Sequence, residues 1–391
     1  MDSEHVEEVL RHFFRTDNIK NAAMLKGGAI NGTYLVNTDK GDYILQSLND
    51  FVFGGNLDGI ERNYRKFAEA RSAAKSAEGV ALAVPEWIMD DEGCYLWRDS
   101  DGLAWRVYPY IKGEPLKLDN DSNGDFDFDC DGRSAAGQDT DSEGQEFDTI
   151  VVFAQAVADM HRILKYYQGQ PEAVIPDYHR IDLYYDNYLD ALDTSVCGND
   201  DIDKLNDRSN RTRCSDWRDE YCENIIAANI DYILKNCVCE ADSVVHGDTK
   251  IENVLYDRES GTAAFIDLDT FTAGSQLMDV ADSVRSILCG GDDIINVDTA
   301  ADAEEAPLNI RFAQAKRFVS EYYKAAGRAP SDDEKRDLKN LIVRMPFELG
   351  LRFYTDHLRE NVYFPVKSDG ENLLRAKQQF TLFSRLDIID L

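Results

Sequence analysis

Apolar residues near the start of the chain recur first at helical spacing and then in strand-like segments. Residues 3–15 place their apolar side chains on one face of a helix. Residues 34–36 and 43–48 are apolar segments on either side of a turn at residues 39–41, which is typical of a β-hairpin. The apolar members of the first segment are Val6, Val9, Leu10, Phe13 and Phe14. We therefore expect an amphipathic helix followed by a hairpin.

Helical spacing returns over residues 57–77, and three short segments of strand-like composition follow it. These segments are residues 85–89, 95–97 and 105–111. The apolar positions of the predicted helix are Leu57, Ile60, Tyr64 and Phe67. The last strand ends at a Lys-Gly-Glu sequence, and the β-rich part of the chain is expected to end there.

From residue 147 onward the apolar spacing is helical. Helices are predicted over about residues 150–167, from about residue 215, and over residues 307–327, 331–359 and 370–386. In the second of these helices, the positions expected to face inward are Trp217, Tyr221, Ile225 and Tyr232. We therefore predict an α+β fold of two lobes. A small β-rich lobe spans residues 1–112, and a large, mostly helical lobe spans residues 113–391.

Residues 119–149 differ in composition from the rest of the chain. They contain eleven acidic residues and one arginine, which predicts a solvated, flexible insert. A calcium loop is the alternative, because residues 119–124 fit its early positions. Cys130 stands where the bidentate Glu of such a loop is expected, and this favours the flexible insert.

The formal net charge of −32 argues against nucleic acid and anionic membranes as partners, because both require a positive surface. The first residues, MDSEHVEEVLRHFF, lack the cationic start and apolar centre of a signal peptide. No apolar run approaches the roughly 18 residues of a membrane helix. The eight cysteines form no CxxC pair and have no histidine at zinc spacing. We expect a cytoplasmic protein with reduced thiols, monomeric or weakly dimeric.

The strongest chemical pattern lies in residues 244–270. The sequence HGD ends at Asp248, Asn253 follows five residues later, and a second apolar run ends at Asp267. Phosphoryl transfer needs a base for the acceptor hydroxyl and oxygen ligands that hold Mg²⁺ on the ATP phosphates. We predict that Asp248 is the base and that Asn253 and Asp267 bind Mg²⁺, in the order of the catalytic and metal loops of protein kinases. An ordinary structural loop is the alternative interpretation.

Other polar residues in and near this segment have two interpretations each. Lys250 is either placed to reach the γ-phosphate or a surface lysine. Asp269 either assists a second ion or makes a structural hydrogen bond. Asp279 and Asp282 either hold the catalytic loop or are first-turn acids favoured by the helix dipole. His246 is expected to brace the loop rather than to transfer a proton.

The hairpin and the strand before the lobe boundary are expected to bind ATP. The candidate residues are Gly28, Asn31, Thr33, Gln46, Tyr108 and Tyr110. The first three belong to a glycine-bearing turn whose backbone can lie over phosphates, although a plain tight turn fits them equally well. Gln46 stands where a protein kinase has a phosphate-pairing lysine, so either Gln46 contacts phosphate or another cation supplies the charge. The two tyrosines lie in the strand that leads into a hinge for adenine.

These motifs resemble those of the aminoglycoside phosphotransferase and choline kinase superfamily, through HGDTKIEN, FIDLDT and DVADSVRS. Further segments resemble the bacterial N-acetylhexosamine 1-kinases, namely GGAINGTYLV, GDYILQSLN, IPDYHR, LGLRFYTDHLRENVYF and ENLLRAKQQF. The matching segments run from about residue 29 to residue 383, apart from the acidic insert. The resemblance implies a bilobal protein-kinase-like fold. It also implies phosphorylation of the anomeric hydroxyl of GlcNAc or GalNAc with ATP and Mg²⁺.

The resemblance also implies roles for individual residues. The base and the Mg²⁺ ligands keep the roles given above, and Gln46 matches a glutamine that these sugar kinases have in the same strand. Arg352 and Tyr363 match positions that contact the sugar, although an arginine in a helix is commonly a salt-bridge partner. The chain departs from the family at Ala29, where relatives often have a histidine. That departure leaves substrate choice and affinity open.

The leading hypothesis is an ATP-dependent kinase of an N-acetylhexosamine or a close hexose. A kinase of an aminoglycoside, choline or another hydroxylated acceptor is the alternative in the same fold. The acidity of the chain suits a cationic acceptor, but Arg352 would disfavour one if it lines the pocket. A third hypothesis is a non-catalytic nucleotide- or calcium-binding protein. The complete set of Asp248, Asn253 and Asp267 argues against it.

Overall fold

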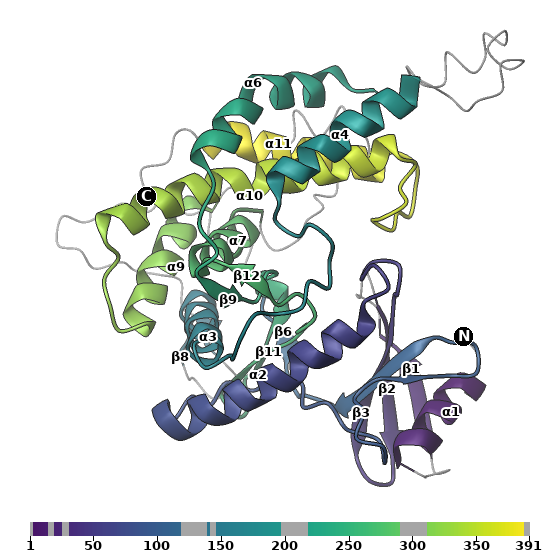
Figure 1. Ribbon diagram of the computed structural model, residues 1–391. Helices are drawn as coiled ribbons and strands as arrows, with labels where there is room; N and C mark the ends of the chain where they lie inside the picture. Colours follow the sequence, from purple (N-terminus) through teal and green to yellow (C-terminus); the bar gives the residue numbers. More distant parts are fainter. Residues whose placement is uncertain are drawn as a thin grey trace, which may run out of the picture.

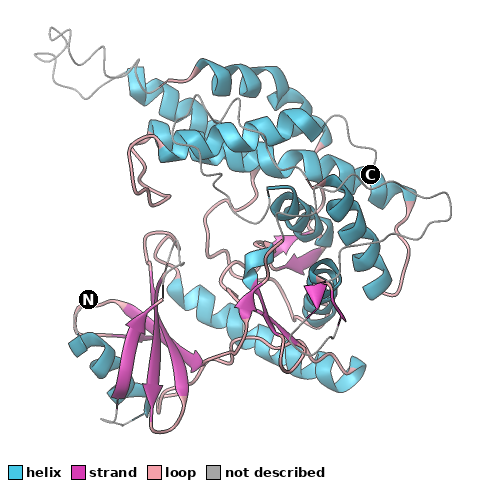
Figure 2. Cartoon of the chain, turned by 180° about the vertical axis from the view of Figure 1, so that it is seen from behind, coloured by secondary structure: helices cyan, strands magenta, loops and turns pink. Residues whose placement is uncertain are grey.

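The structure is a computed structural model that describes residues 3–14, 19–25, 31–118, 139–140, 146–196, 218–289 and 311–386. In this part of the chain an antiparallel sheet lies at one end of the molecule, and most of the helices gather at the other end (Figure 1, Figure 2). The predicted α+β class, with a β-rich first part and a largely helical second part, is confirmed. The lobe boundary at residue 112 stays a prediction.

The sheet has the strand order β1-β2-β3-β5-β4, and all neighbouring strands are antiparallel. Its strands are β1 (Ile19–Met24), β2 (Gly32–Thr38), β3 (Asp42–Leu48), β5 (Ala104–Pro109) and β4 (Trp97–Arg98). The predicted hairpin is β2–β3, and the strand predicted over residues 105–111 is β5. Strand β1 is absent from the sequence prediction, because its sequence IKNAAM has no regular apolar alternation.

Side chains of β3 and β5 alternate between the two faces of the sheet. One face packs on α1 (Ser3–Phe14), for example through Leu45. The other face contributes Ile44 and Tyr108 to the main apolar core. Gln46 and Arg106 are directly paired across β3 and β5 and lie two residues from these core positions. Both therefore project from the face that is turned toward the rest of the molecule.

Helix α2 (Leu57–Glu78) connects the sheet to the helical part of the chain, and it confirms the helix predicted over residues 57–77. It runs from the sheet along α3 (Thr149–Leu164) (Figure 1). Phe67 of α2 stacks on Phe271, with ring centroids 4.8 Å apart. One apolar core therefore extends from the sheet through α2 into the helical part.

Residues 85–89 do not form the predicted strand. The N–H of Trp87 donates to the hydroxyl of Tyr64 on α2 at 2.8 Å, not to a neighbouring strand. The N–H of Ile88 donates to Val107 O of β5 at 2.8 Å. The apolar composition of this segment serves its packing against α2, and for that reason the strand prediction was wrong. The neighbouring prediction, over residues 95–97, is confirmed at Trp97 alone, because strand β4 consists of Trp97 and Arg98.

The other helices of the described ranges are α4 (Ile181–Val196), α6 (Glu220–Asn236), α7 (Gln276–Cys289), α9 (Phe312–Ala325), α10 (Asp332–Leu358) and α11 (Glu371–Leu386). Helix α10 is central and packs against α4, α7 and α11 (Figure 1). A Cβ at Gly350 would lie 2.9 Å from the ring of Phe380, so α10 and α11 approach closely at this point. The helices predicted from about residues 150, 307, 331 and 370 are confirmed as α3, α9, α10 and α11.

The helix expected near residue 215 begins at Glu220 in the structure, and Trp217 lies outside the described residues. Tyr232 was predicted to face inward, but it is 52% exposed. The buried face of this helix consists of Cys222, Ile226, Ile230 and Ile233. These residues follow helical spacing in a different phase, and the prediction for Tyr232 is therefore wrong.

Short strands position the catalytic segment. They are β9 (Ser243–Val245), which pairs with β12 (Thr272–Gly274), and β10 (Val254–Asp257), which pairs with β11 (Thr262–Phe265) and β6 (Glu114–Pro115). A single 3₁₀ turn, η1 (Ile251–Asn253), precedes β10. The two strands predicted to deliver carboxylates at their ends are thus β9 and β11.

Most of the acidic insert lies outside the described residues. Within it, β7 (Asp139–Thr140) pairs with β8 (Glu146–Phe147), and the predicted calcium-loop positions are not described. The five cysteines in the described ranges are free thiols. Across the same ranges, no helix combines the length and the apolar character needed to cross a membrane.

Candidate active site

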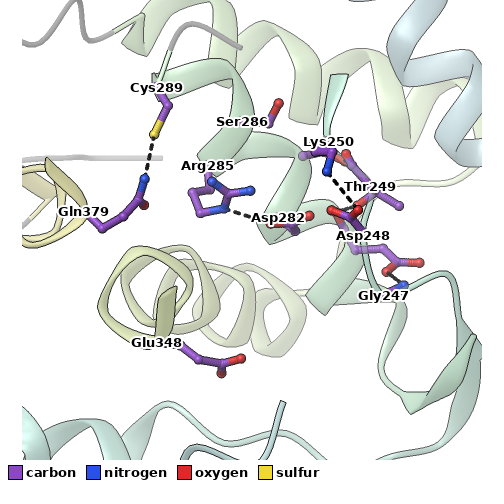
Figure 3. Close-up of polar contacts among 12 residues, drawn as sticks. Gly247, Asp248, Thr249, Lys250, Asp282, Arg285, Ser286, Cys289, Glu348 and Gln379 are labelled. Carbon is purple, nitrogen blue, oxygen red and sulfur yellow. Dashed lines mark hydrogen bonds and ion pairs between the residues drawn. The ribbon is translucent and has the colours of Figure 1, made fainter. Parts of the chain in front are cut away.

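Asp248 lies in the loop between β9 and η1. The amide nitrogen of Asn253 donates to Asp248 O at 2.9 Å and to Asp248 Oδ2 at 3.1 Å. Lys250 Nζ lies 3.1 Å from the same Oδ2 (Figure 3). Two donors therefore fix one carboxylate oxygen, which leaves Oδ1 as the atom that can accept a proton from an acceptor hydroxyl.

The backbone of this loop is held by Asp279 on helix α7. The N–H groups of His246 and Gly247 donate to its two carboxylate oxygens at 2.8 and 2.9 Å. His161 Nε2 donates to Asp279 Oδ2 at 3.0 Å, and the hydroxyl of Tyr322 lies 2.8 Å from His161 Nδ1. Of the two interpretations for Asp279, the structure favours the one in which it holds the catalytic loop.

Asp282, on the same helix, has a different partner. Its Oδ1 accepts a hydrogen bond from Arg285 Nε at 2.8 Å, and in Figure 3 its side chain lies beside Asp248. Burial and the nearby Asp248 carboxylate raise the pKa of Asp282, while Arg285 opposes this shift. Asp282 therefore lies beside Asp248, and it is Asp279 that binds the backbone of the catalytic loop.

Glycine is required at the middle position of HGD. Gly247 has φ +87°, and a Cβ there would lie 2.6 Å from Thr270 O and 3.0 Å from the ring of Tyr178. His246, the preceding residue, is fully buried, and its Nδ1 accepts the Asp248 N–H at 3.3 Å. Burial lowers the pKa of His246 and keeps the ring neutral. This geometry is that of a brace, as the sequence predicts.

The two carboxylates of the predicted reaction have opposite electrostatics. Burial tends to raise the pKa of Asp248, but the Lys250 ammonium, together with His246 and Arg285, keeps that pKa below its usual value. Burial, together with the Asp269 and Asp248 carboxylates, raises the pKa of Asp267 to about 7. The lowered pKa favours the ionised form of Asp248, as a base requires, whereas Asp267 forms no ion pair with another described residue.

A divalent cation fits the side of the site where Asp267 lies. Asp267 has a left-handed backbone, with φ +63°, a strained conformation that is found at functional sites. Asn253 uses its amide nitrogen toward Asp248, so its amide oxygen is the atom that can face a cation. Among the described residues no cluster of three or more His, Cys, Asp or Glu residues could hold a metal. One carboxylate and one amide suit Mg²⁺ that completes its shell with ATP phosphates and water.

Arg106 connects the sheet to the metal loop. Its Nε donates to Gln46 Oε1 at 2.9 Å, and its two terminal nitrogens bind the two carboxylate oxygens of Asp269. Gln46 Nε2 donates to Thr33 Oγ1 at 3.1 Å, and Asn31 Nδ2 donates to Asp269 Oδ2 at 3.2 Å. The structure thus brings three predicted ATP-binding residues, Asn31, Thr33 and Gln46, to one buried ion pair.

The sequence prediction does not include Arg106 as a site residue. The available signal is a single charged residue inside the apolar segment 105–111, in the strand that precedes the predicted hinge. The sequence leaves open whether another cation supplies the positive charge near Gln46, and Arg106 is a cation in that position. Asp269 makes a structural ion pair here, which is the second of its two interpretations.

The remaining candidates for ATP binding are less closely grouped. Tyr108 is buried in the main core, on the same face of the sheet as Arg106. Tyr110 is 41% exposed, and its backbone N–H donates to Asp42 O at 2.9 Å. Gly28 lies outside the described residues. Their roles stay predictions.

On the other side of the catalytic loop, Arg352 of α10 lies among aromatic rings. Its guanidinium carbon is 5.1–5.7 Å from the ring centroids of Tyr178, Tyr184, Tyr363 and Phe364. The structure therefore brings together the predicted substrate residues Arg352 and Tyr363. Among the described residues, no carboxylate forms an ion pair with Arg352.

Two loops hold these rings in place, and neither is predicted from the sequence. Tyr178 donates its hydroxyl hydrogen to Gly247 O at 2.8 Å, which ties the aromatic cluster to the catalytic loop. Asp356 at the end of α10 accepts the backbone N–H groups of Tyr363 and Phe364, both at 2.8 Å. The sequence IPDYHR contained a signal for the first loop, but the role of Asp356 depends on a turn that has no such pattern.

A part-buried hydrogen bond between His179 and Glu348 supports the first loop. His179 Nδ1 lies 2.8 Å from Glu348 Oε1, and His179 Nε2 lies 3.1 Å from Gly247 O. Burial alone would raise the pKa of Glu348, but Arg344 and His179 outweigh it and lower that pKa to about 2. His179 itself has a left-handed φ of +59°. The strained loop is therefore fixed against both α10 and the catalytic segment.

Comparison with known proteins identifies the class of this site. Residues 129–319, which contain Asp248, Asn253 and Asp267, match the model of the phosphotransferase enzyme family, APH. The GDP complex of aminoglycoside 2'-phosphotransferase-IIIa is a similar solved structure, with 14% identity, a TM-score of 0.54, and coverage of 97% of this chain and 99% of that chain.

Two further solved structures cover nearly the whole chain. Spectinomycin phosphotransferase with ADP and spectinomycin has 13% identity, a TM-score of 0.54, and coverage of 100% and 95% of the two chains. A thermostable mutant of an aminoglycoside phosphotransferase with AMP-PNP and hygromycin B has 16% identity, a TM-score of 0.53, and coverage of 98% and 99%.

The fold is that of the kinase-like aminoglycoside phosphotransferases, as predicted. The family match over the catalytic segment confirms the predicted enzyme class, an ATP-dependent phosphotransferase that acts on a hydroxyl group. ATP and Mg²⁺, the predicted cofactors, are those of this class. Neither comparison identifies the acceptor.

Proposed function

We propose that this phosphotransferase transfers the γ-phosphoryl group of ATP to the anomeric hydroxyl of an N-acetylhexosamine, GlcNAc or GalNAc. Asp248 is the base, Lys250 contacts the γ-phosphate, and Asn253 and Asp267 bind Mg²⁺. The choice of an N-acetylhexosamine rests on the resemblance of the sequence to the N-acetylhexosamine 1-kinases and on the chemistry around Arg352.

The composition of the acceptor side is the observation that supports a sugar. Arg352 is flanked by four aromatic rings, and Tyr178 links this cluster to the backbone beside Asp248. Aromatic walls with a few polar groups are typical of small-molecule sites. A guanidinium can donate to hydroxyl and acetamido oxygens. It would repel an ammonium-bearing acceptor, and this favours a neutral sugar over an aminoglycoside or choline.

The proposed reaction follows from the geometry of the catalytic loop. The acceptor hydroxyl loses its proton to Asp248 as its oxygen forms a bond to the γ-phosphorus. The bond from that phosphorus to the β–γ bridging oxygen breaks, and ADP leaves. Asn253 and Lys250 hold Asp248 in place, while Asp279 fixes the backbone that carries it. Bound Mg²⁺ neutralises the charge that develops on the phosphates.

A second acceptor class has support of a different kind. The net charge of −32 suits a cationic acceptor, and solved structures with the same fold are described as aminoglycoside phosphotransferases. However, eleven of the acidic residues lie in the insert at residues 119–149. Two buried carboxylates near the proposed acceptor side, Asp282 and Glu348, already have cationic partners. An aminoglycoside therefore remains the alternative acceptor.

The proposed enzyme acts in the cytoplasm as a monomer or weak dimer. ATP and sugar phosphates are cytoplasmic metabolites. Cys94, Cys222, Cys237, Cys239 and Cys289 are free thiols in the described part of the chain, which suits a reducing compartment.

The test is ADP release from Mg-ATP in the presence of GlcNAc, GalNAc, glucose, galactose, choline or kanamycin. We expect turnover with an N-acetylhexosamine and a loss of about 100-fold or more in kcat for Asp248→Asn, because the base is removed. Asp257→Asn, at the last residue of β10, is the control and should retain activity. Turnover with kanamycin or choline alone would keep the enzyme class and reject the sugar.

A further inference from the structure

Arg106 is a charged residue on β5, next to the central strand β3 of the sheet, and it is almost completely buried. Its side chain is 2% exposed, as is that of its ion-pair partner Asp269. The guanidinium also lies over the ring of Trp87, with its carbon 4.5 Å from the ring centroid. A buried charge is costly unless its partner and hydrogen bonds are well arranged, and here both conditions are met.

The contacts of this guanidinium join segments that are distant in sequence. Nε binds Gln46 on β3, and the terminal nitrogens bind Asp269, which is 163 residues away and two residues past the Mg²⁺ ligand Asp267. Asn31, at the end of the glycine-bearing turn, adds a third donor to Asp269. The phosphate-facing strand, the turn and the metal loop therefore meet at one ion pair.

We propose that Arg106 is a positioning residue for Mg-nucleotide binding, a role that rests on the proposed ATP-dependent function. It sets the metal loop against the sheet through Asp269, and it orients the amide of Gln46. Because both oxygens of Asp269 are used by Arg106 and Asn31, Asp267 is the carboxylate of the loop that faces the cation. A protein kinase has a lysine at the position of Gln46 on β3. In this chain the positive charge is instead on Arg106 of the neighbouring strand β5, and it binds Asp269 of the metal loop.

The planar fork of arginine is essential to this role. Two parallel N–H groups meet the two oxygens of Asp269, while Nε reaches Gln46 in the same plane. A lysine would keep the charge but has no fork with which to bind both residues. Arg106→Lys therefore separates the proposed positioning role from the simple need for a buried positive charge.

The experiment measures Mg-ADP binding to the full chain by calorimetry at a series of Mg²⁺ concentrations, with thermal unfolding of each variant. We expect Arg106→Lys and Arg106→Met to weaken Mg-ADP binding by about tenfold or more and to raise the Mg²⁺ concentration at half-saturation. Arg98→Met, on the neighbouring strand β4, is the matched control because Arg98 is exposed. A stabilising role alone would lower the melting temperature and leave the Mg²⁺ dependence unchanged.

A double-mutant cycle tests whether Arg106 acts through Asp269. Arg106→Met leaves the Asp269 carboxylate buried without its partner, beside Asp267. We expect that adding Asp269→Asn restores folding and part of the Mg-ADP affinity, so that the two losses are not additive. Additive losses would overturn the proposal, as would wild-type Mg²⁺ dependence in Arg106→Lys.

This binding assay needs no acceptor, so the two proposals fail separately. Mg-ADP binding by the wild type without turnover of any sugar would reject the acceptor and leave the Arg106 test intact. Wild-type binding that Arg106→Lys does not change, together with sugar turnover, would reject the role of Arg106 alone.

Discussion

The site contains two arginines in contrasting surroundings. Arg106, on the nucleotide side, is almost fully buried and has its charge matched within the chain by Asp269. Arg352, on the acceptor side, is half-buried among four rings, and no carboxylate of the described residues pairs with it. Both side chains belong to the candidate active site. The guanidinium of Arg106 binds protein atoms, whereas that of Arg352 has N–H groups that a ligand can bind.

The difference indicates that Arg106 stabilises the fold of the site, whereas Arg352 is placed to bind a ligand. An arginine that is fully paired within the protein holds segments in register, and its removal disturbs the protein before any ligand binds. An arginine surrounded by rings is stabilised by only about 0.5–2 kcal/mol of cation–π attraction, and its N–H groups can still bind ligand oxygens. Substitutions at the two positions should therefore affect different constants.

Arg352→Met should produce the largest kinetic change on the acceptor side. We expect the KM for the sugar to rise about 10- to 100-fold, because a charged hydrogen-bond donor contributes about 1.5–3 kcal/mol. The KM for ATP and the melting temperature should change little. Steady-state kinetics with each substrate varied in turn measure both values.

Arg359→Met is the matched control for this substitution. Arg359 lies at the end of the same helix, where it binds the backbone of Asn187 at the surface. A rise in the KM for ATP with Arg352→Met, or an equal effect of both variants on the sugar, would contradict the contrast between the two arginines.

The pH dependence of Mg²⁺ binding distinguishes the nucleotide side from the acceptor side. The pKa of Asp267 is about 7 without metal, because of burial and of the Asp269 and Asp248 carboxylates, with Lys250 and Arg106 opposing. Mg²⁺ binding requires the ionised form. We therefore expect the apparent Mg²⁺ affinity to fall up to about tenfold per unit as the pH drops below 7.

The same pKa predicts the stability of the metal-free protein. The folded pKa lies above the unfolded value of about 3.9. The proton of Asp267 therefore contributes stability at low pH, and this contribution is lost as the pH rises through 7. Thermal unfolding at pH 6 and pH 8 should show this slope. Mg²⁺ should offset it, and Asp267→Asn should remove it. A slope that persists in Asp267→Asn would assign it to other groups.

Ser331→Ala should give the smallest effect. Ser331 and Glu334 form a capping box at the start of α10, far along the helix from Arg352. Loss of the cap should lower the free energy of unfolding by about 1 kcal/mol. The KM values for ATP and sugar should stay at wild-type levels, as thermal unfolding and steady-state kinetics will show. A kinetic effect here would mean that general destabilisation accounts for the changes seen at the arginines.

The candidate catalytic residues could be predicted from the sequence because they lie close together along the chain. Asp248, Asn253 and Asp267 lie within twenty residues, and the strands that carry them are short, so their order alone indicated a phosphotransferase. Amphipathic helices such as α1 could be predicted for a similar reason, since their apolar residues recur at regular helical spacing.

The contacts that support the candidate site could not be predicted from the sequence, because they depend on strand register and loop conformation. Arg106 reaches Gln46 because β5 pairs with β3 in the observed register, and it meets Asp269, which is 163 residues away in sequence. Tyr178 reaches Gly247 through a loop with left-handed residues, and Asp356 captures the backbone of a turn. Each contact joins residues that are separated in sequence, without a periodic pattern to indicate it.

The packing of α2 against α3 has a practical consequence for dissection of the protein. The main apolar core is continuous, and its members range in sequence from Ile44 in the sheet to Leu386 in α11. It includes the contact of Phe67 with Phe271. The predicted boundary at residue 112 therefore separates two proposed functions, nucleotide binding and catalysis, but it does not separate two independent apolar cores. An isolated N-terminal fragment would expose the inner face of α2 to water and would be prone to aggregate. Work on nucleotide binding is thus best carried out with the intact polypeptide.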